Sequence, residues 1–264
     1  MTHATTGQRQ LQIERLAVEV HADRGALGAR AAEAAARHLR TLLERRRPVR
    51  AIFACAPSQN EFLAALAGAP GINWADVTAF HMDEYVGLPA SHPASFRRYL
   101  KEHLTALVPL GRCCEIAADA PDADAECRRY ADLLGQEPID LVCLGIGENG
   151  HLAFNDPPVA DFQDPRPVKV VELDQACREQ QVHDGCFASL ADVPRRAITL
   201  TIPTLISAAR LFCMVPGPRK APAVRAALRG GVTTACPASI LRTHPAATLY
   251  LDRDSAALLE ADGK

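Results

Sequence analysis

The chain has 264 residues, of which 48% are hydrophobic and 23% are charged. This composition is ordinary for a globular protein and excludes collagen-like repeats, a coiled coil and wholesale disorder. Because 29 basic residues stand against 31 acidic ones, giving a formal net charge of -2, the sequence lacks the electrostatic signature of a nucleic-acid or membrane-surface binder. We therefore expect a small-molecule partner, with no nucleic acid and no membrane involved.

The chain start and the cysteines bear on domain organisation and location. The first ten residues are polar and carry no apolar core of a signal peptide, so we expect residues 1–10 to be disordered and residues 11–264 to form a single domain. No run of about 18 apolar residues occurs, which favours a cytoplasmic protein. The nine cysteines include no C-x-x-C pair and several lie in apolar runs. We expect reduced core residues and no structural metal.

Helical and strand-like segments alternate from the start of the chain. Residues 26–47 place leucines and alanines on one side at helical spacing, with arginines at the C-terminal end, and this pattern predicts an amphipathic helix. The apolar run Val49–Ala54 predicts a strand. Ser58 and Glu61 have the spacing of a capping box and predict a helix over residues 62–66.

The alternation continues to the C-terminus. Further strands are predicted at Val77–Met82, Leu141–Ile146, Ala197–Ile202, Leu211–Val215 and Ala247–Leu251, and further helices at Ser95–Leu107, Ala123–Leu134 and Lys220–Leu228. Short apolar strands between helices are typical of a parallel sheet covered on both faces. We predict an α/β fold with a doubly wound, mostly parallel, Rossmann-like sheet and a ligand at the carboxyl ends of its strands. The proline-rich segment 155–181 has no regular pattern, and a lid and a plain surface excursion both remain open.

Polar residues follow three of the predicted strands. Asp83 and Glu84 come after the strand that ends at Met82, where paired acids suit general-base chemistry. An acidic pair that leaves the sheet for solvent or caps a helix is the competing interpretation. Arg219 and Lys220 follow a later strand and open a helix, which suits an anion site, although two solvated cations on a turn explain them equally well.

A glycine-rich turn follows the strand at residues 141–146. Gly145, Gly147 and Gly150 allow a sharp turn and a close approach to a ligand, and His151 titrates in a range suited to proton transfer. A buried histidine with satisfied hydrogen bonds is the alternative. The spacing differs from G-x-G-x-x-G, and no acidic residue suited to a ribose follows, which argues against a nicotinamide cofactor.

Four motifs carry a family resemblance over most of the chain. They are FHMDEYVGLPASHPASF at residues 80–96, GIGENGHLAFNDP at 145–157, GPRKA at 217–221 and PASILRTHP at 237–245. In these motifs the sequence resembles the glucosamine-6-phosphate deaminases, also called isomerases, within a broader group that includes 6-phosphogluconolactonases. The resemblance implies a cofactor-free ring opening, an aldose-to-ketose isomerisation and a loss of ammonia, converting glucosamine-6-phosphate to fructose-6-phosphate.

The resemblance also implies roles for individual residues. Asp83 is the expected base at carbon 2, His151 the expected proton carrier for ring opening, and Lys220 the expected phosphate ligand. Asn149 and Asp156 occupy the places of two acids that flank and orient the histidine. The residues that we assign to substrate binding are Ser58, Gln59, Glu84, Gly147, Gly150 and Lys220.

The sequence departs from the family pattern at three places. Asn149 replaces a common Asp, and Asp156 is shorter than the usual Glu, so both changes are expected to lower or retune the basicity of the histidine. A phosphate loop that usually reads T-G-S-T-P or T-G-G-T-P is here CAPSQ, at residues 55–59, and Pro57 donates no N–H. The family carries an arginine on the segment before the strand that here contains VPRRAITL (residues 193–200). In this sequence His183 or Asp184 stands in its place.

These departures keep other functions open. A non-catalytic sugar-phosphate sensor on the same fold is one alternative. A lactonase that retains His151 but gives Asp83 no role is another, as is a related isomerase with a different substrate. A homo-oligomer is expected from the resemblance alone.

Overall fold

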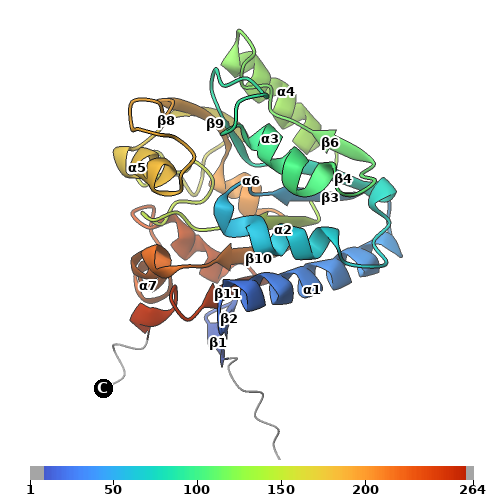
Figure 1. Cartoon of the computed structure of the whole chain (residues 1–264), viewed down its shortest axis with the longest axis vertical. Helices are drawn as coiled ribbons and strands as arrows, with labels where there is room; N and C mark the ends of the chain where they lie inside the picture. Colours follow the sequence, from blue (N-terminus) through green and yellow to red (C-terminus); the bar gives the residue numbers. More distant parts are fainter. Residues whose placement is uncertain (1–8, 260–264) are drawn as a thin grey trace, which may run out of the picture.

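An eight-stranded sheet forms the centre of the molecule, whose computed structural model describes residues 9–259 (Figure 1). The strand order is β1-β2-β11-β10-β7-β3-β4-β6, and every neighbouring pair is parallel except β1 with β2. The strands are β1 (Arg9–Ile13), β2 (Leu16–His21), β3 (Val49–Phe53), β4 (Val77–His81), β6 (Arg112–Cys114), β7 (Leu141–Leu144), β10 (Arg210–Val215) and β11 (Ala247–Asp252). The predicted mostly parallel α/β sheet is confirmed.

Helices cover both faces of this sheet (Figure 1). The α-helices are α1 (Arg24–Leu43), α2 (Asn60–Ala67), α3 (Phe96–Leu100), α4 (Ala123–Gly135), α5 (Gln175–His183), α6 (Ile202–Ile206) and α7 (Ala221–Arg229). Side chains alternate along β3, because Phe53 packs with α1 and α2 in one apolar cluster while Ile52 packs with α4, α6 and α7 in the other. The sheet is therefore doubly wound, as predicted.

Three antiparallel strands form a second sheet, which is not hydrogen-bonded into the first as a continuous sheet. Its order is β5-β9-β8, with β5 (Asp83–Tyr85), β9 (Arg196–Leu200) and β8 (Val168–Glu172). The strand predicted at 197–202 was placed in the parallel sheet, and this placement was wrong. Because β9 is buried at four of its five residues, its apolar run has no alternation that would distinguish the two sheets.

Three further expectations need correction. Segment 155–181 is not irregular throughout, because β8 follows its prolines and α5 begins within it. Helix α2 begins at Asn60, and Ser58 lies in a preceding 3-10 turn without capping it. Residues 9 and 10 pair with β2, since β1 adds an edge strand, whereas residues 1–8 of the segment expected to be disordered lie outside the described residues.

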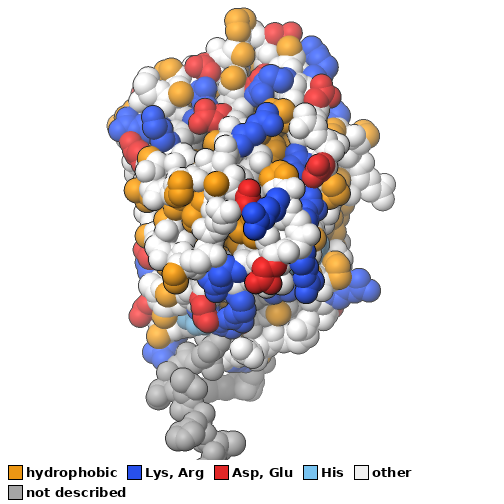
Figure 2. Space-filling model, turned by 90° about the vertical axis from the view of Figure 1, so that its right-hand side faces the viewer, with side chains coloured by type: hydrophobic (Ala, Val, Ile, Leu, Met, Phe, Trp, Pro, Cys, Tyr) orange, Lys and Arg blue, Asp and Glu red, His pale blue; other side chains and the backbone are white. Residues whose placement is uncertain are grey.

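Within residues 9–259, no helix is long and apolar enough to cross a membrane. Acidic and basic side chains lie interspersed on the face shown in Figure 2. The nine cysteines are free, and most of them are buried.

Candidate active site

A pocket opens where the winding of the sheet changes direction. From β3 the chain proceeds outward to β4 and β6, and β7 then returns to the other side of β3. The loops after β3 and β7 therefore diverge, and such a switch point is where doubly wound sheets bind ligands. The pocket lies between these loops, and its lining includes six predicted site residues: Ser58, Gln59, Asp83, Gly147, His151 and Lys220.

Asp83 and Glu84 point in opposite directions because both lie on the short strand β5. Asp83 lines the pocket and is 7% exposed. The Glu84 carboxylate is fully buried and accepts hydrogen bonds from Ser95 Oγ at 2.8 Å and from the backbone N–H groups of Phe96 and Arg97 at 3.1 and 3.0 Å. It does not line the pocket, so its assignment to substrate binding gains no support from this geometry.

The environment of Asp83 makes it a stronger base than a solvated aspartate. Burial raises the pKa of its carboxyl well above the usual range, and the negative charge of Glu84 raises it further. A carboxylate whose pKa lies closer to neutrality takes a proton from carbon more readily. Asp83 is therefore placed to act as a base, whereas Glu84 has a structural role.

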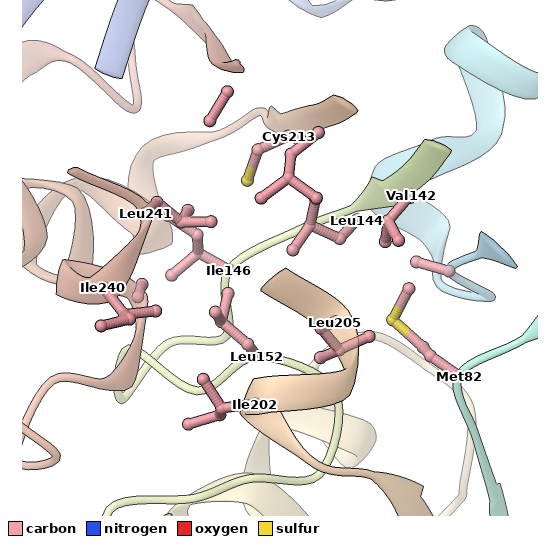
Figure 3. Close-up of a cluster of buried hydrophobic side chains, with 14 of the residues drawn as sticks. Met82, Val142, Leu144, Ile146, Leu152, Ile202, Leu205, Cys213, Ile240 and Leu241 are labelled. Carbon is pink, nitrogen blue, oxygen red and sulfur yellow. The ribbon is translucent and has the colours of Figure 1, made fainter. Parts of the chain in front are cut away.

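The glycine-rich turn holds His151 through two glycines and two apolar anchors. Gly147 lies against the imidazole ring, where a Cβ atom would collide with it, and Gly150 has φ +87°. Ile146 and Leu152 on either side of the turn point into the apolar cluster beneath it, towards Ile240 and Leu241 (Figure 3). This anchoring fixes the position of the imidazole in the pocket.

Asp156 and Asn149 orient His151 from behind. His151 Nδ1 lies 2.8 Å from Asp156 Oδ1, and the Asn149 side-chain nitrogen donates to the same oxygen at 2.9 Å. The Asn149 side-chain oxygen, Oδ1, accepts a hydrogen bond from the His151 backbone N–H at 3.1 Å. Burial opposes ionisation of Asp156, but the interactions with His151 and Asn149 outweigh it and hold the pKa of that carboxyl below its usual value. Asp156 is thus an anion that supports an imidazolium.

Lys220 and Arg219 do not form the paired anion site considered above. Lys220 is 8% exposed and lines the pocket, and burial lowers the pKa of its ammonium although Asp184 and Glu148 act in the opposite direction. Arg219 is exposed and is engaged by Glu148 at 3.0 Å and by Asp184 at 3.1 Å. Lys220 is the cation that a ligand in this pocket meets.

Amide side chains supplement Lys220. Gln59 Nε2 donates to Ser58 Oγ at 3.0 Å and to the Met214 carbonyl at 3.3 Å. Gln180 and Gln181 of α5 also line the pocket, and the sequence analysis missed both. In the sequence they are two adjacent polar residues at the end of segment 155–181, which has no regular pattern that would have predicted a role for them. His183 and Asp184, which follow them, lie in an adjoining pocket.

One cluster in this region has the donor types of a metal site. His151, Asp156 and Cys177 place their ligand atoms within 4.8 Å of one another, and all three residues are buried. Cys177 comes from α5. From the sequence we expected no metal site, and no motif there pointed to Cys177.

Comparison with known proteins identifies the family of this chain. The family described as glucosamine-6-phosphate isomerases/6-phosphogluconolactonase matches residues 22–250. A glucosamine-6-phosphate deaminase of Exiguobacterium sp. is 41% identical over 176 residues, which are 67% of either chain. One of Geobacillus sp. is 38% identical over 192 residues, covering 72% of this chain and 74% of the relative.

Solved structures give the same result. A monomeric glucosamine-6-phosphate deaminase has a TM-score of 0.82 at 28% identity, covering 91% of this chain and 99% of that one. A 6-phosphogluconolactonase from Trypanosoma brucei has a TM-score of 0.74 at 18% identity, covering 92% and 98%, and shows a shared fold. The family match extends over most of the sequence, and the chain belongs to the glucosamine-6-phosphate isomerase/6-phosphogluconolactonase family.

Proposed function

We propose that the protein isomerises and deaminates glucosamine-6-phosphate, producing fructose-6-phosphate and ammonia without a cofactor. Relatives named glucosamine-6-phosphate deaminase support this substrate. The observation that carries the proposal is the convergence of Asp83, His151 and Lys220 on one pocket. A buried base, an oriented imidazole and a cation are the groups that this reaction needs.

The first step is the opening of the sugar ring. His151 accepts the proton of the anomeric hydroxyl and delivers a proton to the ring oxygen, so that the ring C–O bond breaks and a free aldehyde forms. The Asp156 anion stabilises the imidazolium that exists between the two transfers. Asn149 keeps both groups in place through its two hydrogen bonds.

The second step moves a proton between neighbouring carbons. Asp83 removes the proton from carbon 2 while the oxygen on carbon 1 takes up a proton, giving an enolamine. Asp83 then returns its proton to carbon 1 and the nitrogen gives one up, giving a ketose imine, so the proton gained by the oxygen is balanced by the one lost from the nitrogen. Water then adds to carbon 2 and ammonia leaves, which balances as amino-sugar phosphate plus water giving keto-sugar phosphate plus ammonia. The raised pKa of Asp83 lets one carboxyl both accept and return this proton.

The phosphate binds at the other end of the pocket. Lys220 supplies the charge, and the Ser58 hydroxyl supplies a polar contact in place of a glycine-rich loop. The homo-oligomer and the cytoplasmic location expected from the sequence stay predictions. Light scattering on the purified protein and fractionation of cells test them.

Ammonia release from glucosamine-6-phosphate, with fructose-6-phosphate measured in parallel, tests the proposal. We expect equimolar products and a loss of about 10²- to 10⁴-fold in kcat for Asp83→Asn, because this variant has no base at carbon 2. Binding of the substrate to the variant, measured by calorimetry, should persist. Binding without turnover in the unsubstituted protein would favour a sensor, and hydrolysis of 6-phosphogluconolactone that survives Asp83→Asn would favour a lactonase.

A further inference from the structure

Three donors of different softness converge behind the catalytic pocket. They are the Nδ1 atom of His151, the carboxylate of Asp156 and the thiol of Cys177, all within 4.8 Å of one another. Asp156 is fully buried and Cys177 is 1% exposed. The Cys177 sulfur and an Asp156 carboxylate oxygen lie within 4.8 Å of each other, so both side chains reach the same point.

These donors match the preference of one class of ion. Imidazole, carboxylate and thiolate are the ligands of Zn²⁺, which binds them tetrahedrally at about 2.0–2.3 Å. Donors at such bond lengths lie roughly 3.3–3.8 Å apart, so small rotations of the three side chains suffice to enclose an ion. Mg²⁺ and Ca²⁺ prefer oxygen ligands and do not fit a site with sulfur.

The cluster adjoins the pocket through His151. The His151 side chain lines the pocket, whereas Asp156 and Cys177 do not. The three residues supply three of the four ligands of a tetrahedral zinc ion, and in sites with three protein ligands a water molecule completes the set.

We propose that His151, Asp156 and Cys177 form a Zn²⁺ site whose occupation switches the enzyme off. The ion forms bonds to the thiolate sulfur, to one Asp156 oxygen and to Nδ1 of His151. The thiol proton is released to solvent, and the neutral imidazole keeps its proton on Nε2. The ion thereby removes Asp156 as the partner of an imidazolium and blocks the proton transfers of ring opening. The inhibition rests on the proposed function, whereas the metal site itself does not.

Co²⁺ binding tests the site without any substrate. Metal-free protein is titrated with Co²⁺, and the thiolate-to-cobalt charge-transfer absorption in the near ultraviolet is recorded. We expect saturation at one equivalent and displacement by Zn²⁺. Cys177→Ala should abolish this absorption and weaken Co²⁺ binding at least about tenfold, with Cys177→Ser and circular dichroism as checks on folding. Cys113→Ala, which removes a half-buried thiol beside Cys114 on β6, is the matched control and should retain the signal.

Inhibition tests the consequence. Zn²⁺ should inhibit ammonia release reversibly, with activity restored by EDTA, and the inhibitory concentration should rise at least about tenfold in Cys177→Ala relative to the metal-free rate of that variant. Because ligands must lose protons, binding should strengthen as the pH rises. Absence of thiolate absorption, its survival in Cys177→Ala, or equal inhibition of both proteins would overturn the proposal. Failure of the metal-free protein to release ammonia would refute the proposed function while leaving the Co²⁺ result readable.

Discussion

At the scale of single residues, Gln59 carries an unused acceptor. The Met214 carbonyl can only accept, so the Gln59 atom that faces it must be the amide nitrogen. The remaining oxygen, Oε1, is buried and has no hydrogen-bond partner among residues 9–259. A buried acceptor without a partner costs about 1–3 kcal/mol, which a substrate hydroxyl relieves. We infer that Gln59 accepts a hydrogen bond from the substrate.

Replacing Gln59 by Met tests this role. The variant keeps the length of the side chain but removes the acceptor, and a neutral hydrogen bond is worth about 0.5–1.5 kcal/mol. We expect KM to rise about three- to tenfold while kcat changes little, measured by ammonia release. Gln136→Met, at an exposed position after α4, is the control. An unchanged KM would show that Oε1 does not meet the substrate.

Asn149 gives a second prediction at this scale. From the sequence we expect Asn149 to lower or retune the basicity of the histidine, but in the structure its amide donates to Asp156 and accepts from the backbone N–H of His151. An ionised Asp has no donor, so Asn149→Asp replaces a hydrogen bond by repulsion between two carboxylates. We expect kcat at neutral pH to fall at least about tenfold, since hydrogen bonds to charged groups are worth about 1.5–3 kcal/mol. A variant faster than the unsubstituted protein would contradict this account.

At the scale of elements, Glu84 joins β5 to the start of α3. Its carboxylate accepts from two backbone N–H groups of the first turn and lies 3.4 Å from Arg97 Nε. Carboxylates stabilise helix N-termini because the exposed N–H groups there carry partial positive charge. The same strand bears Asp83, so this connection also holds the proposed catalytic base in place.

Glu84→Ala should therefore destabilise the whole domain. Removing the carboxylate leaves the Ser95 hydroxyl and two buried backbone N–H groups without their acceptor, although Arg97 keeps its ion pair with Asp119. Each unsatisfied buried group costs about 1–3 kcal/mol, so the free energy of unfolding should fall by about 3–5 kcal/mol in urea denaturation. The exposed pair of Arg98 with Glu102 in the same region offers a control. Glu102→Ala should cost less than about 1 kcal/mol. Equal losses for the two variants would rule out the proposed role of Glu84.

The elements also show what the sequence could and could not predict. Apolar runs identified the strands around the switch point, and the turn after β7 identified the histidine. The direction of Glu84 was not predictable, because it depends on β5 pairing with β9, more than a hundred residues away. Gln180, Gln181 and Cys177 were missed because α5 is polar and contributes to the site only through tertiary packing.

At the scale of the whole molecule, Asp83, which we propose as the catalytic base, opposes folding at neutral pH. The folded state raises the pKa of Asp83, so it binds the Asp83 proton more tightly than the unfolded chain does. This contribution to stability is fully present below the unfolded pKa and is lost as the pH rises through the folded pKa. At neutral pH the folded protein therefore carries a buried carboxyl that a neutral side chain of the same shape would relieve.

Asp83→Asn should consequently stabilise the protein while it abolishes turnover. We expect a higher Tm than the unsubstituted protein at pH 7, by about 2–4 °C for each kcal/mol relieved in a chain of this size. The gain should shrink as the pH falls towards the unfolded pKa of about 3.8, because below that pH the carboxyl is protonated in both states. Asp132→Asn, an equal charge change at an exposed position on α4, should leave the Tm nearly unchanged. If Asp83→Asn lowered the Tm at pH 7, the carboxylate would be a net stabiliser, and its raised pKa would no longer explain how one group both takes and returns the proton.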